Sequence, residues 1–137
     1  MSRSSDGIIC YGYDLDGLEL PWEEYEFEEW YIHAILGINI SNMDYSERYA
    51  IKSIIPLDVV YHCCDEDPMY ILAIANSVQK SSRGNPTQID FNMLSNEITQ
   101  EKLDKLNDVF KIVIESQEDY DSETLREPKW WLASWLG

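Results

Sequence analysis

Apolar side chains recur at helical spacing in two parts of the chain. Over residues 21–36 they fall three and four positions apart, the period of one helical face, at Phe27, Trp30, Tyr31, Ala34 and Ile35. Pro21 suits the first position of a helix, and Gly37 suits the position just past its end. Acidic and aromatic residues also alternate over residues 24–28, which would suit a strand, but the longer pattern favours a helix over 21–36.

The clearer helical signal follows Thr99. The hydroxyl of this threonine can cap the first turn of a helix. Behind it, an apolar stripe repeats at helical intervals at Leu103, Leu106, Phe110 and Val113. A shorter helix is predicted within residues 43–53.

Short apolar runs rich in β-branched and aromatic side chains predict three strands, at residues 8–13, 57–63 and 69–75. Residues 65–68 suit a hairpin connection between the second and third of these. Residues 130–136 are apolar on both faces, which favours a covered, central strand. The elements together predict one α+β domain over residues 1–137, with a mostly antiparallel sheet and two helices packed on one face.

Composition supports a folded domain in a reducing compartment. Hydrophobic residues make up 45% of the 137 residues, and 5 Trp and 9 Tyr are far more than disordered acidic chains carry. The cysteines are Cys10, Cys63 and Cys64, an odd number with two adjacent, which is a poor framework for disulfides. The chain has no apolar signal core at its start and no apolar run of about 20 residues, so we expect a cytoplasmic protein without a membrane span.

Charge is the most unusual property of the sequence. The chain carries 26 acidic and 10 basic residues, a formal net charge of −16. Residues 1–70 hold 15 of the acids against 3 bases, so the N-terminal half dominates this charge. Such a field repels nucleic-acid phosphates and anionic lipids, and it speeds encounters with basic surfaces. We therefore expect a basic protein partner, although acidity can also serve solubility alone.

Two acidic clusters are the candidate partner-binding sites. They comprise Glu23, Glu24, Glu26, Glu28 and Glu29 in the first predicted helix, and Asp65, Glu66 and Asp67 after the second predicted strand. On a helix, carboxylates three or four positions apart lie about 5–6 Å from each other. This spacing is comparable to that of phosphates along a DNA strand, so a row such as Glu23, Glu26 and Glu29 can imitate a nucleic acid. Interleaved aromatic side chains could anchor the contact or belong to the core, namely Trp22, Tyr25, Trp30 and Tyr31.

Motifs for metals, cofactors and catalysis are weak. Asp14, Asp16 and Gly17 resemble the start of a calcium loop, but the later ligand positions do not match, so a turn is expected. A composite metal site is conceivable from Cys10, His33, His62 and Cys64, although the spacing is not that of structural zinc sites. A cysteine nucleophile with His33 as its base has no motif support. We therefore expect no cofactor, no metal and no enzymatic activity.

Some stretches resemble small phage-encoded accessory proteins. They are residues 11–15, 68–72, 82–86 and 128–134. The resemblance implies a viral context, in which small acidic proteins often inhibit host nucleic-acid-binding defence machines, including anti-CRISPR and anti-restriction proteins. The expected function is thus a nucleic-acid mimic that occupies a basic groove. An immunity protein or antitoxin that blocks a basic toxin remains the alternative, and a small enzyme or metal-binding protein a further one.

Overall fold

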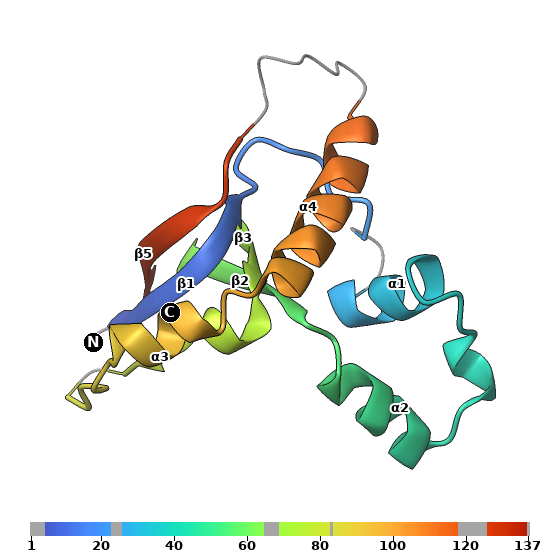
Figure 1. The fold of residues 1–137 in the computed structure, drawn as a ribbon, viewed down its shortest axis with the longest axis horizontal. Coiled ribbons are helices and arrows are strands. Elements are labelled where there is room, and N and C mark those ends of the chain that lie inside the picture. The colour runs from blue at the N-terminus through green and yellow to red at the C-terminus, as the bar shows by residue number, and fades with distance from the viewer. Residues whose placement is uncertain (1–4, 23–25, 65–68, 83, 118–125, 137) are drawn as a thin grey trace.

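The computed structural model describes residues 5–22, 26–64, 69–82, 84–117 and 126–136, which form a five-stranded sheet with helices against it (Figure 1). The strands are β1 (Ser5–Asp14), β2 (Leu57–Cys64), β3 (Met69–Ile74), β4 (Gln79–Ser81) and β5 (Lys129–Leu136). Their order is β3-β2-β5-β1-β4, and β3 also pairs with β1. Every pairing is antiparallel except that of β2 with β5. The prediction of an α+β fold with a mostly antiparallel sheet is confirmed.

The sheet coils so far that its pairings form a ring of β1, β3, β2 and β5. β2 pairs with β3 from Leu57 to His62 and then with β5 at Cys63 and Cys64. Cys63 has a φ of 79°, a backbone conformation that residues other than glycine rarely adopt. The bend at this residue comes where β2 changes partner, so it turns the end of the strand from β3 toward β5.

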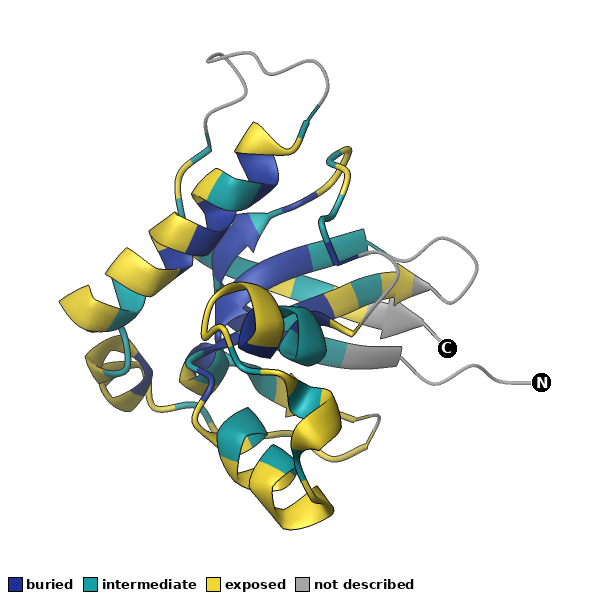
Figure 2. Cartoon of the chain, turned by 90° about the vertical axis from the view of Figure 1, so that its right-hand side faces the viewer, coloured by how far each residue is buried: buried dark blue, intermediate teal, exposed yellow. Residues whose placement is uncertain are grey.

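The helices are α1 (Phe27–Ala34), α2 (Tyr45–Ser53), α3 (Phe91–Asn96) and α4 (Gln100–Glu115), with short 3-10 turns at Ile40–Asn42 and Ala75–Ser77. Thr99 caps α4 as predicted, because its Oγ1 accepts a hydrogen bond from the Lys102 backbone N–H at 3.3 Å. The stripe on α4 is also confirmed: Leu106, Phe110 and Val113 are buried. The exposed residues of α4 face away from the sheet, as the colours in Figure 2 show.

One face of the sheet holds the main core. Buried side chains of α1 and α4 pack there against strand residues, among them Ile32 and Leu106 against Tyr13 and Leu72. Tyr13 stacks on Phe110 with ring centroids 3.8 Å apart. The two predicted helices therefore do lie on one face. The alternate strand residues form a second, smaller cluster on the other face, made of Ile8, Cys10, Val60, Ile71 and Ala73.

The predicted start of the first helix is wrong. α1 begins at Phe27, and Glu26 precedes it with an extended φ of −66° and ψ of 146°. Trp22 is buried before the helix begins and packs edge to face on Phe27, with ring centroids 4.9 Å apart. Burial of this indole in the core thus overrides the helical spacing at Pro21 and Trp22. The predicted end at Leu36 is two residues too late, because α1 ends at Ala34. Gly37 lies beyond this end with a φ of 68°, and the Ile38 N–H bonds back to the Ile32 carbonyl at 3.1 Å.

The prediction for the last strand is correct in position and wrong in its environment. β5 lies between β1 and β2 in the sheet, and all eight of its residues pair with β1. Trp131 and Ala133 pack against the second cluster, but Leu132 on the opposite face is 80% exposed. The helices cover the other part of the sheet, so apolar side chains on both faces of β5 do not mean that both are buried.

Candidate functional site

A hollow of about 610 Å³ lies between residues 15–22, the start of α1, and strands β2 and β3. Its wall and floor are largely apolar, formed by Leu15, Leu18, Leu20, Trp22, Val59 and Tyr70. Four carboxylates also line it, from Asp16, Glu26, Glu28 and Asp58. None of the described lining residues is a lysine or an arginine. We call this hollow the acidic groove.

Residues 15–22 form one wall of the groove, and hydrogen bonds from two residues distant in the sequence hold this segment in place. The Arg126 guanidinium donates hydrogen bonds to the carbonyls of Asp14, at 2.6 Å, and Asp16, at 2.8 Å. Gln117, just after α4, exchanges two hydrogen bonds with the Glu19 backbone, at 2.9 and 2.7 Å. The position of Asp16 at the groove therefore depends on residues about a hundred positions further along the chain.

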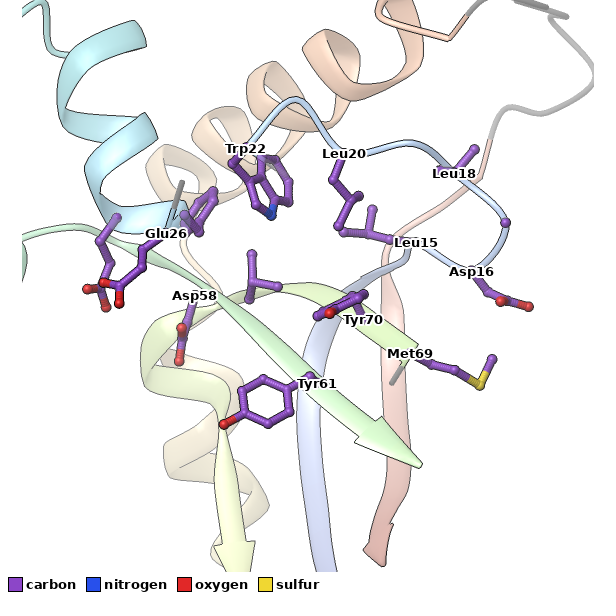
Figure 3. Close-up of a pocket in the computed structure, with 14 residues that line it drawn as sticks. Leu15, Asp16, Leu18, Leu20, Trp22, Glu26, Asp58, Tyr61, Met69 and Tyr70 are labelled. Atoms are coloured by element: carbon purple, nitrogen blue, oxygen red, sulfur yellow. The ribbon is translucent and has the colours of Figure 1, made fainter. Parts of the chain in front are cut away.

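Glu26 and Asp58 lie at one end of the acidic groove, and Asp16 lies at the other (Figure 3). Glu26 is exposed, while Glu28 is half-buried in the first turn of α1, where the helix dipole favours negative charge. Lys52 on α2 offsets part of this charge, because its Nζ lies 3.9 Å from the Glu28 Oε2. Both side chains of that pair are partly exposed, so the pair is weak and leaves the end of the groove negative.

Asp58 is half-buried on β2, and its environment shifts the pKa of its carboxyl group. Burial raises the pKa of Asp58 above its ordinary value, while a hydrogen bond from the Val59 backbone and the charge of Lys80 act in the opposite direction. A carboxylate in such a place costs stability when it is ionised. Perturbed carboxylates of this kind are enriched at functional sites, which supports the groove as a site.

The structure places the predicted acidic residues unevenly. Glu26 and Glu28 line the acidic groove, and Glu29 lies half-buried in the first turn of α1 outside the groove lining. Glu23, Glu24, Asp65, Glu66 and Asp67 lie outside the described residues. The predicted phosphate-like row on a single helix is wrong, because Glu26 precedes α1 and does not share a helical face with Glu29.

The described aromatic residues between the acids are core residues rather than surface anchors. Trp22 and Tyr31 are buried, and Trp30 packs against the same core. Tyr25 lies outside the described residues. The sequence analysis does not predict two of the groove carboxylates as partner-binding residues. It places Asp16 in a turn and Asp58 in a strand. An acidic residue in an apolar strand pattern was the available signal for Asp58.

The metal and thiol candidates whose side chains the structure describes do not come together. No three His, Cys, Asp or Glu residues among those the structure describes form a group that could hold a metal ion. Asp14 closes a simple turn instead, since its Oδ1 accepts the Asp16 N–H at 3.1 Å. Cys10 is buried inside the sheet, whereas Cys63 and His33 are exposed on β2 and α1.

Comparison of the chain with protein-family models, with curated proteins and with solved structures gave no match. Within the described ranges, no helix is long and apolar enough to cross a membrane.

Proposed function

We propose that the protein binds a basic surface of another protein through the acidic groove. The observation that carries this proposal is the set of four carboxylates around an apolar floor, with no cationic residue among the described lining residues. Apolar pockets with a few placed charges are typical of sites that recognise a specific group. Arginine and lysine side chains match this one, because their apolar stems can lie on the floor while their charged ends meet the carboxylates.

Net charge extends the same argument beyond the groove. At −16 the protein attracts basic surfaces over the distance of a Debye length, about 8 Å at physiological salt. Such attraction acts mainly on the rate of association. Basic surfaces of this strength are typical of proteins that bind nucleic-acid phosphates. The proposed function is inhibition: the protein occupies the nucleic-acid-binding groove of a host defence protein, in the manner of phage anti-CRISPR or anti-restriction proteins.

A competition assay tests this function. A purified restriction endonuclease and a purified CRISPR effector complex are each loaded with labelled DNA, and the protein is titrated in while release of the DNA is measured. A basic toxin nuclease serves as a third target, since the antitoxin function predicts inhibition of that target alone. Release that weakens steeply with added salt is the expected result for the defence proteins. If the protein displaces DNA from none of these targets, the proposed class of partner is contradicted.

A charge-matched pair of variants separates the groove from net charge. The groove variant carries Glu26→Gln, Glu28→Gln and Asp58→Asn. The control variant loses the same charge from exposed positions on α4, through Glu101→Gln, Asp108→Asn and Glu115→Gln. Exposed ion pairs contribute about 0.2–1 kcal/mol each, so the loss of three charges should weaken binding by the groove variant roughly 3- to 150-fold. Equal weakening of both variants would mean that only overall charge matters.

A further inference from the structure

β2 has an edge that no described strand covers. β2 pairs with β3 along Leu57 to His62, but its other edge meets β5 only at Cys63 and Cys64. Over Leu57 to His62, therefore, β2 has a strand neighbour on one side only among the described residues. Uncovered strand edges are templates for pairing with another chain.

The hydrogen-bonding pattern shows which backbone groups point to that edge. The Ala75 N–H donates to the Pro56 carbonyl at 2.9 Å, which makes these two residues a hydrogen-bonded pair. In an antiparallel ladder such pairs alternate along the strand, so Asp58 and Val60 direct their backbone groups toward β3. Val59 between them directs its N–H and carbonyl outward.

The acidic groove runs along this same edge. Successive side chains of a strand point to opposite faces, yet both Asp58 and Val59 line the groove. A hollow reaches both faces only around the edge of a strand, and β3 occupies the other edge. Figure 3 shows Trp22 and Leu20 on one side of the β2 ribbon and the Asp58 carboxylate on the other.

Asp58 also marks where an added strand would bond. The Val59 backbone N–H lowers the pKa of the Asp58 carboxyl, so this carboxylate lies near the outward-facing N–H of Val59. A cationic side chain that pairs with Asp58 would therefore lie beside the Val59 N–H.

Resting on the proposed function, we propose that the basic partner enters the acidic groove as an extended segment that adds a strand to the open edge of β2. Main-chain hydrogen bonds form at Val59, and alternate side chains of the segment lie on the aromatic floor beside Trp22 and Tyr70. Arginine or lysine side chains of the segment meet Glu26, Glu28 and Asp58. In strand addition the backbone supplies affinity and the alternate side chains supply specificity.

The test uses the wild-type protein and the peptide acetyl-Arg-Val-Arg-Val-Arg-amide as a probe, with binding measured by calorimetry at low ionic strength. Two further probes carry N-methyl groups, one on both valines and the other on the second and third arginines. Their charges are equal, but each lacks N–H donors along a different edge of the extended peptide. Strand addition predicts that one methylated peptide binds about tenfold or more weakly while the other binds like the parent peptide.

Equal binding by all three peptides overturns strand addition and leaves the proposed function intact, because charge alone would then account for the affinity. No measurable binding of the parent peptide also overturns it. In that case the charge of Asp58 serves only to prevent other chains from pairing with this edge of β2. An intermolecular NOE between a peptide Hα and the Val59 backbone is the expected structural signature, and its absence in a saturated complex counts against the proposal. The DNA-release assay decides the proposed function independently of these results.

Discussion

Replacing Gly12 with alanine should strongly lower the free energy of unfolding of this protein, because β1 passes very close to β3 at this residue. A Cβ added at Gly12 would overlap the Leu72 carbonyl oxygen and lie 2.7 Å from the Ala73 Cα. Non-bonded carbon atoms ordinarily lie about 3.5–4.0 Å apart, so the strands would have to separate by about 1 Å. The atoms that must move are backbone atoms, and no side-chain rotation relieves the overlap.

The expected loss is about 3–5 kcal/mol. Overpacking typically costs about 1–3 kcal/mol. Separation of the strands also weakens the hydrogen-bonded pairs Tyr13 with Leu72 and Leu15 with Tyr70, at about 1 kcal/mol for each pair. Urea unfolding followed by tryptophan fluorescence measures this difference in the free energy of unfolding. A thermal melt should show the midpoint lowered by roughly 10–20 °C for a chain of this size.

Gly7→Ala is the matched control on the same strand. Its added Cβ would approach only the Ser81 Oγ, at 3.0 Å, and that hydroxyl can rotate away. We expect Gly7→Ala to change the free energy of unfolding by less than about 1 kcal/mol. If Gly12→Ala were as mild as Gly7→Ala, the close approach of β1 to β3 would be refuted, and with it the pairing that closes the ring of strands.

Three further outcomes test the core, the helix cap and the buried thiol. Leu106→Ala, at a fully buried position in the main core, should lower the free energy of unfolding by about 2–5 kcal/mol in urea titrations, whereas Leu132→Ala at an 80% exposed position should change it by less than about 0.5 kcal/mol. Thr99→Ala removes the acceptor for the Lys102 N–H and should destabilise by about 1 kcal/mol in the same titrations, with Thr99→Ser close to wild type. Burial raises the pKa of the Cys10 thiol to about 12, with the charge of Asp58 as the second cause. The unfolded thiol ionises near 8.5, so stability present below that pH should fall as pH rises toward 12, and Cys10→Ala should show a smaller decrease in unfolding titrations across this range.

Signals between residues close in sequence were enough for part of the fold. The cap at Thr99 and the stripe behind it involve residues within about four turns of one helix, and both are present in α4. Gly37, which follows the end of α1, has the positive φ that is typical of a glycine just past a helix. The strand runs at 57–63 and 69–75 likewise predicted neighbouring antiparallel strands, because a short connection makes them adjacent.

Sequence alone also determined the sign of the charge, and through it the basic character of the expected partner. Tertiary structure decided where that charge could act. Asp16 and Asp58 share the acidic groove although they are far apart in the sequence, and no spacing rule connects them. Burial of Trp22 in the core moved the start of α1 to Phe27 and with it the position of Glu26. Local patterns report which conformation a segment prefers, but long-range packing selects which segments meet, so the groove exists only in the folded chain.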